Sequence, residues 1–296
     1  MKKAFLQLHL AVFFAGFTAI LGKLIHLNEG ILVAYRMLLS ALPLGGILLL
    51  RRQLAKSSLP DLLRLFGVGA VIAMHWVTFY GSIKYSNVSV SVTCLSAIGF
   101  FTSFFEPAIN RRRIDPAEVV LGCLAIGGIY LIFNFYPQYE TGIVFGLLSA
   151  MFASLFPIFN KRLLQRFTPS NLTFYEMAGG FLALLLLVPL YLRFFPATYF
   201  LPTPSDWLWL LVLAGICTVW SFTLSLSALK YISPFTANLT YNLEPVYSII
   251  LAFLLFGENR FLGHGFYAGI TLILIAIVLQ MKRVWNEQRG GSPTVR

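Results

Sequence analysis

The chain has 296 residues, of which 58% are hydrophobic and only 11% are charged, and its mean hydropathy is +0.80. Soluble globular domains are not built this way, so the composition predicts an all-α integral membrane protein. The formal net charge of +11 raises the question of nucleic acid as a partner, which the positions of the charges answer below.

Ten apolar segments follow one another along the chain, and about 20 residues of helix suffice to cross a bilayer. They are residues 4–23, 30–50, 62–83, 87–109, 117–136, 141–161, 170–193, 206–228, 233–256 and 262–281. The loops between them are too short for a soluble catalytic domain, and residues 284–296 form a polar tail. The first segment follows two lysines like a signal peptide, but nine further spans favour a retained helix.

The basic residues gather on alternate loops. If the N-terminus is cytoplasmic, 17 Lys and Arg residues lie on the inner side and four on the outer side, with Arg36 inside the membrane. This is the positive-inside pattern, and it predicts that both termini are cytoplasmic. The basic excess therefore reflects topology and contact with anionic lipids of the bilayer, and no nucleic-acid partner is expected.

Weak but collinear matches indicate an internal repeat. Residues 83–87 (IKYSN) resemble 229–233 (LKYIS), and Tyr35-Arg36-Met37 resembles Tyr175-Glu176-Met177. We therefore expect a first repeat over 1–138 and a second over 139–283, although chance matches are common among apolar helices. Each half has five spans, an odd number, so the second half is inverted, as in many transporters.

The segment 233–256 is polar where it should be most apolar. It contains Asn238, Tyr241, Asn242, Glu244 and Pro245 near its middle. A carboxylate at that depth costs about 2.5–3.5 kcal/mol on insertion scales, so it should face protein or water. Pro245 removes a backbone donor and loosens the helix. We expect Glu244 to bind a substrate ammonium or a coupling proton; the alternative is that it locks this helix into the bundle.

Polar and aromatic residues on other segments are candidates for the same pathway. His75 could carry a proton, stack on a substrate or bond to a neighbouring helix. The remaining substrate-binding candidates are Trp76, Tyr80, Ser89, Thr93, Ser96 and Trp220, with the substrate sandwiched between Trp76, Tyr80, Trp220 and Tyr241. Small hydroxyl residues also serve as packing contacts between membrane helices.

Three further charged residues are candidates for coupling or gating. Arg36 either snorkels to the interface or reaches the cavity to meet an anionic group. Glu176, its counterpart in the repeat, could form gate-side ion pairs with it, or both could be interface anchors. Glu106 either lines the pathway or pairs with the Arg111–Arg113 run.

With these features, the sequence resembles the EamA family of the drug/metabolite transporter superfamily. The resemblance rests on the ten spans in two halves, on Ala-Leu-Lys-Tyr-Ile-Ser at 228–233, on Glu244-Pro245 and on Leu255-Phe256-Gly257-Glu258. It covers residues 4–283 and is strongest over 222–260. The first half departs from the family pattern, because Arg111-Arg112 stands where the Gly-Glu ending would fall.

The resemblance implies a basket-like fold with a central cavity and with the fifth and tenth helices at the periphery. It also implies export of amino acids, related metabolites or drugs by alternating access, in the bacterial inner membrane. We therefore expect a secondary transporter of amino acids or related small metabolites, with a multidrug or cationic-compound exporter as the alternative and proton coupling left open.

Other functional classes have little support in the sequence. No HExxH, GxSxG or paired His/Asp motif is present, so no enzyme is expected, and a channel or sensor lacks a symmetric filter. Cys94, Cys123 and Cys217 all lie in apolar segments, which predicts buried free thiols rather than a disulfide, a metal site or a cofactor. Gly265 and Gly269 form a GxxxG spacing that permits a weak homodimer or serves packing within a monomer.

Overall fold

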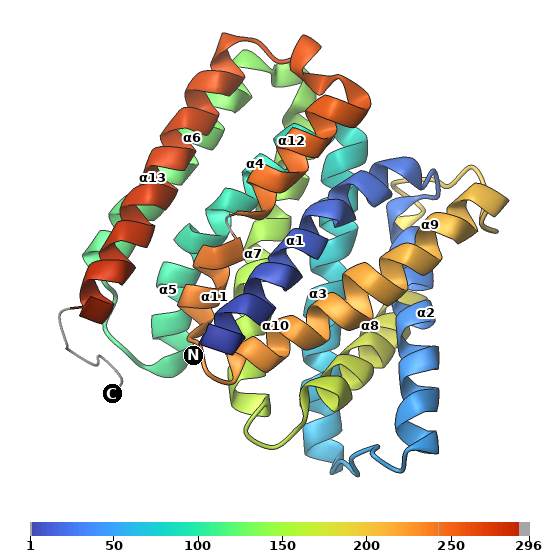
Figure 1. Ribbon diagram of the computed structural model, residues 1–296. Coiled ribbons are helices and arrows are strands. Elements are labelled where there is room, and N and C mark those ends of the chain that lie inside the picture. The colour runs from blue at the N-terminus through green and yellow to red at the C-terminus, as the bar shows by residue number, and fades with distance from the viewer. Residues whose placement is uncertain (1, 242, 290–296) are drawn as a thin grey trace.

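The computed structural model describes residues 2–241 and 243–289 (Figure 1). Asn242 lies outside the described residues, and so does the side chain of Asn238, so the expectations for these two remain untested predictions. In the first half the helices are α1 (Lys2–Leu24), α2 (Glu29–Leu50), α3 (Leu59–Tyr85), α4 (Val88–Cys94), the 3-10 turn η1 (Leu95–Ala97), α5 (Ile98–Asn110) and α6 (Pro116–Phe135).

The second half follows the same order after the 3-10 turn η2 (Pro137–Tyr139). Its elements are α7 (Glu140–Leu163), α8 (Pro169–Tyr191), α9 (Pro204–Ala214), the π-helix η3 (Gly215–Trp220), α10 (Ser221–Leu229), α11 (Pro234–Tyr241), α12 (Glu244–Phe256), the 3-10 turn η4 (Glu258–Arg260) and α13 (His264–Arg289).

Every expected segment coincides with helix. Nine stretches of the described residues are long and apolar enough to cross a membrane. The shorter α12, together with α11, forms the one remaining span, which is the ninth in chain order. The protein is therefore an all-helical, multi-pass membrane protein with a ten-helix arrangement. An even number of spans returns the chain to the side on which it began, and α1 starts at the same end of the bundle at which α13 finishes (Figure 1).

The packing follows the order expected for two related halves. In the first half α3 packs on α7 and α8, and α10 and α9 make the corresponding contacts with α1 and α2. Similarly, α4 and α5 pack on α7, whereas α12 and α11 pack on α1. The fourth span is interrupted by η1, and the ninth is divided between α11 and α12. This pattern is what a two-fold relation between residues 1–138 and 139–283 predicts, and the repeat boundaries themselves remain a prediction.

The fifth and tenth spans lie together at one edge of the bundle, as α6 and α13 in Figure 1. Their backbones touch at two glycines: a Cβ on Gly128 would lie 2.6 Å from the Gly269 carbonyl oxygen, and one on Gly269 would lie 2.5 Å from that of Gly128. Gly265 faces the Phe135 ring in the same way. The GxxxG residues therefore serve contacts within the chain, and this surface gives no argument for a dimer. Cys123 on α6 is exposed, contrary to the expectation that all three thiols are buried.

Candidate functional site

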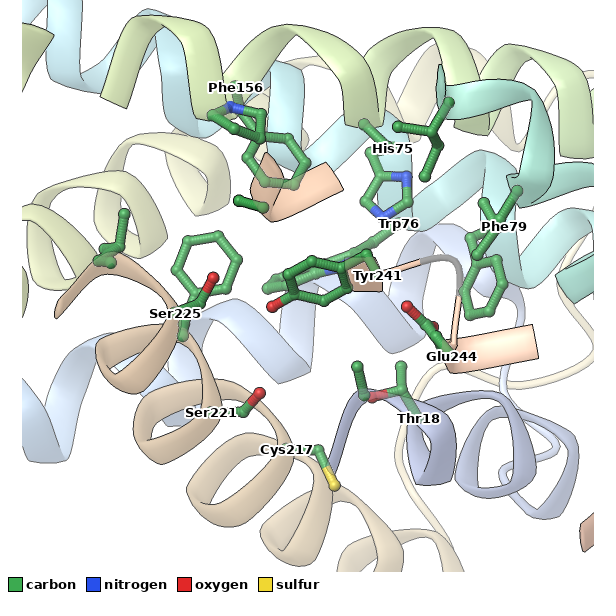
Figure 2. Close-up of a pocket in the computed structure, with 18 of the residues that line it drawn as sticks. Thr18, His75, Trp76, Phe79, Phe156, Cys217, Ser221, Ser225, Tyr241 and Glu244 are labelled. Atoms are coloured by element: carbon green, nitrogen blue, oxygen red, sulfur yellow. The ribbon is translucent and has the colours of Figure 1, made fainter. Parts of the chain in front are cut away.

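A cavity lies inside the bundle, between spans of both halves (Figure 2). Its empty space is about 870 Å³, a figure that includes the open space at its mouth. The aromatic lining residues are Trp76, Phe79, Phe156, Phe222 and Tyr241, and the polar and ionisable ones are Thr18, Arg36, His75, Asn160, Cys217, Ser221, Ser225 and Glu244. Such a lining combines apolar walls with a few groups that can orient a ligand.

Glu244 reaches this cavity because the ninth span is interrupted. The helix α11 ends at Tyr241, and α12 begins at Glu244 with Pro245 in its first turn. The first residue of a helix lies beside unpaired N–H groups and the positive end of the helix dipole, which favour a carboxylate. Figure 2 shows this carboxylate directed into the cavity, and the residue is 8% exposed.

Arg36 is held rigidly at the cavity wall. Its Nη1 donates to the Tyr80 hydroxyl at 2.7 Å, and its Nε donates to Thr218 Oγ1 at 2.8 Å. The guanidinium carbon lies 3.5 Å from the centroid of the Trp76 ring, a cation–π contact. Only 2% of the residue is exposed, so Arg36 does not snorkel to the interface.

Thr218 owes its position to the π-helix η3. Its hydroxyl donates to the Leu213 carbonyl at 2.8 Å, five residues back along the chain, and accepts from Arg36. Single π-turns within α-helices occur often at functional sites. No sequence signal pointed to Thr218, because nothing in residues 215–220 distinguishes a π-turn from ordinary helix.

The two charged groups of the cavity do not neutralise each other. Arg36 and Glu244 both line it, yet no nitrogen–oxygen pair between them is within the 4.0 Å of a salt bridge. Within the described part of the chain, Glu244 accepts no hydrogen bond and Nη2 of Arg36 donates none. Buried charges are costly unless they are paired. The arrangement therefore leaves one guanidinium group and one carboxyl group available to a ligand.

His75 is also fixed in the wall. Its Nδ1 is 2.8 Å from Ser149 Oγ and 3.0 Å from the Ser149 carbonyl oxygen, and its ring stacks on Phe79. The second ring nitrogen is the one left for a ligand. His75 thus combines two of the expected roles, a bond to a neighbouring helix and a place in the cavity.

Several expected site residues lie elsewhere. Ser89 Oγ, in the first turn of α4, donates to Glu258 at 2.6 Å, and Thr93 Oγ1 donates to the Ser89 carbonyl oxygen within the same helix. Ser96 is buried in η1 but is not part of the lining. The hydroxyl groups of Ser89 and Thr93 therefore make hydrogen bonds within the protein instead of facing the cavity.

The expected aromatic sandwich is also corrected. Trp76 and Tyr241 line the cavity, but Tyr80 lies behind Trp76 as the partner of Arg36. Trp220 is 53% exposed and packs on Phe14. The cavity is lined from one face of this span, by Cys217, Ser221, Phe222, Ser225, Leu226 and Leu229, and the neighbouring Trp220 is not among them. The helix that carries Trp220 does line the cavity, but it does so with the face opposite to Trp220.

The gating candidates have separate surroundings. Arg36 and Glu176 form no ion pair, and Glu176 is fully buried rather than anchored at an interface. Glu106 is half-buried on α5, close enough to Lys161 to attract its charge, and does not line the cavity. Asn160, which the sequence reasoning missed, does line it.

Comparison with known proteins decides the family. Residues 2–134 and 140–281 match the sequence profile of the EamA-like transporter family. The chain belongs to this family. An uncharacterized transporter of Clostridium kluyveri is 23% identical to it over 99% of this chain and 100% of that protein. An uncharacterized transporter of Archaeoglobus fulgidus is 26% identical over 60% of this chain and 59% of that protein, so the match spans less than two thirds of its length.

A solved crystal structure of a protein shares the fold of this EamA-family member. It superposes with a TM-score of 0.67 at 17% identity, covering 99% of this chain and 100% of the other. At that identity the likeness concerns the fold alone. Membership of the EamA-like transporter family indicates a multi-pass membrane transporter, which implies a small-molecule substrate and a lipid bilayer.

Proposed function

We propose that this EamA-family member is a secondary transporter that exports amino acids or related small metabolites by alternating access. The observation that carries the proposal is the pair of unneutralised charges, Arg36 and Glu244, in one aromatic-walled cavity. A zwitterion presents the complementary pair of charges, so it would replace the water lost by both groups on burial.

Each charged group of a zwitterionic substrate has a matching residue in the cavity. A substrate carboxylate fits Arg36, because Nη2 remains available and the guanidinium plane is fixed by Trp76, Tyr80 and Thr218. Arginine recognises carboxylates with its planar fork. A substrate ammonium fits Glu244, and an apolar or aromatic side chain fits between Phe79, Phe156 and Phe222.

Export of cationic compounds is the second candidate. Glu244 beside Tyr241 and the phenylalanine rings is a suitable site for a lipophilic cation. Arg36 argues against it, because a second cation in the same low-dielectric cavity is repelled. A zwitterion satisfies both charged groups, whereas a cation satisfies only one.

Alternating access requires closures at both ends of the cavity, and two lysines at equivalent places in the halves provide contacts of that kind. At one end Lys23 Nζ lies 2.6 Å from Glu258. At the other end Lys161 Nζ donates to the carbonyl oxygens of Leu229, Lys230 and Ile232 at 2.6–3.0 Å. We assign the Lys161 end to the cytoplasm, in a bacterial inner membrane, from the positive-inside pattern.

The test is counterflow in proteoliposomes, with labelled amino acids of differing side chains and a labelled cationic dye. Glu244→Gln should raise the KM for amino acids by about 10- to 100-fold, since a hydrogen bond to a charged group contributes about 1.5–3 kcal/mol. Glu140→Gln, the same change at an exposed residue outside the cavity, is the matched control.

The possible outcomes separate the two candidates. Saturable exchange of amino acids that weakens in Glu244→Gln supports the proposal. Exchange of the dye alone would select the cation exporter. Exchange that is unchanged in Glu244→Gln would remove Glu244 from the site, and non-saturable flux would indicate a pore.

A further inference from the structure

A second buried carboxyl group lies outside the cavity lining, on α8. Glu176 is 0% exposed, and neither of its carboxyl oxygens has a hydrogen-bond partner. Asn160 of α7 is the polar side chain beside it, also 0% exposed, and neither its amide oxygen nor its amide nitrogen completes a hydrogen bond. Asn160 in turn lines the cavity. The two residues thus form a polar path from the cavity to an isolated carboxyl group.

Tight helix packing keeps the Glu176 carboxyl group where it is. A Cβ on Gly69 of α3 would lie 2.2 Å from the backbone oxygen of Glu176 and 2.7 Å from the backbone nitrogen of Gly180. The backbones of α3 and α8 are therefore in direct contact at this level. The backbone of Glu176 is held against α3, and the amide of Asn160 is the polar group that lies beside its carboxyl group and also lines the cavity.

No neighbouring charge neutralises Glu176. The helices packed against α8 are α2, α3 and α10, and α10 has no ionisable side chain. On α2, Arg36 is bound to Tyr80 and Thr218. On α3, His75 is bound to Ser149, and Asp61 pairs with two arginines, Arg64 and Arg166. Among the described residues no Lys, Arg or His forms a salt bridge with the Glu176 carboxyl group.

An ionised carboxylate in this position would lack water, a counter-ion and a full set of donors. The effective cost of such a charge is several kcal/mol, and a carboxyl group in that situation takes up a proton instead. When water enters the cavity, it can accept the proton of the carboxyl group, while the amide of Asn160 donates a hydrogen bond to the resulting carboxylate. The same group can therefore hold a proton in one state of the cavity and release it in another.

We propose that Glu176 is the proton-coupling site of the transporter, and that Asn160 is the positioning residue that links it to the cavity. The proposal rests on the proposed function and adds to it a separate site for the coupling ion. One proton from water binds one carboxylate oxygen, and the same proton leaves to water on the other side of the membrane. The substrate charges remain with Arg36 and Glu244.

The experiment compares two modes of transport in the same proteoliposomes: amino-acid exchange without a pH gradient, and accumulation driven by an imposed pH gradient. In Glu176→Gln, which keeps the size of the side chain and removes the proton site, the ratio of gradient-driven accumulation to exchange should fall at least tenfold. Glu140→Gln should leave that ratio as in the wild type. Asn160→Ala should shift the pH dependence of accumulation while retaining some coupling.

A second readout is direct. Purified wild-type protein in weakly buffered detergent should release or take up protons when amino acid is added, as reported by a pH-indicator dye, and Glu176→Gln should not. Coupling that persists in Glu176→Gln, or accumulation that follows a sodium gradient instead of a pH gradient, would overturn the inference. Absence of amino-acid exchange in the wild type would instead refute the proposed function.

Discussion

Replacing Glu258, in the turn that follows α12, by alanine should destabilise the protein strongly. Glu258 is 3% exposed and accepts four hydrogen bonds: from Lys23 Nζ (2.6 Å), the Val88 backbone N–H (3.1 Å), the Ser89 backbone N–H (2.9 Å) and Ser89 Oγ (2.6 Å). These contacts join α1, the start of α4 and the turn after α12. One side chain therefore holds elements of both halves together.

The magnitude follows from which donors lose their partner. Lys23 is about one third exposed and can turn to water, so its share resembles that of a surface ion pair, about 0–1 kcal/mol. The N–H groups of Val88 and Ser89 are buried at the first turn of α4 and would stay unpaired, at about 1–3 kcal/mol each. These contributions sum to about 2–7 kcal/mol, and we take the middle of that range, about 3–5 kcal/mol, which is also the cost of breaking other buried pairs.

The assay is thermal unfolding in detergent micelles. For 296 residues an unfolding entropy of about 2.1 cal/mol/K per residue gives about 0.6 kcal/mol/K, so Glu258→Ala should lower Tm by about 5–8 °C. Lys23→Met should lower it by only about 1–2 °C, and the exposed Glu140→Ala by less. If Glu258→Ala and Lys23→Met lowered Tm equally, the ion pair rather than the α4 N-terminus would carry the effect, and the reasoning would be refuted.

The pH dependence checks the same reasoning. Burial alone would raise the pKa of Glu258, but hydrogen bonds from Lys23 and Ser89 outweigh it, and the pKa lies below its ordinary value. A carboxyl group with a lowered folded-state pKa contributes stability that is fully present above its unfolded value of about 4.3 and is lost as pH falls through the folded value. The Tm difference between wild type and Glu258→Ala should thus be constant from pH 8 to 5 and shrink below about pH 4.

Two further predictions concern the cavity and the packing of α3. Arg36→Lys keeps the charge but loses the stacking on Trp76 and the fixed bonds of the guanidinium, so the KM for amino-acid exchange should rise about 10- to 100-fold; an unchanged KM would remove Arg36 from the site. Gly69→Ala should lower the stability in detergent by about 1–3 kcal/mol, because the new Cβ meets the backbone of α8. Gly67→Ala, where nothing lies within 4 Å, should be neutral or raise Tm, and equal effects of the two changes would contradict the packing argument.

The ten membrane helices could be predicted from the sequence because each depends only on the length and apolarity of its own segment. The interruption of the ninth span was likewise visible in Pro245. The family match then agreed with the resemblance seen in residues 222–260. These are local properties, and they do not require knowledge of what each helix packs against.

The lining of the cavity could be predicted only in part. Polarity within the membrane singled out Arg36, His75 and Glu244, and in the structure all three line one cavity. Polarity gave the wrong place for Ser89, since the donor set around it belongs to Glu258, 169 residues later in the chain. It gave no indication of Thr218, whose position depends on a π-turn.

Local composition therefore predicts the number, length and order of the helices, and the presence of costly polar groups within them. The tertiary structure decided which way each helix faces. Trp220 and Ser221 are adjacent in sequence, yet one is exposed and the other lines the cavity. The rotation of a helix about its axis is set by contacts with its neighbours, such as Gly69 against α8 and Gly128 against Gly269, and those contacts exist only once the helices have packed.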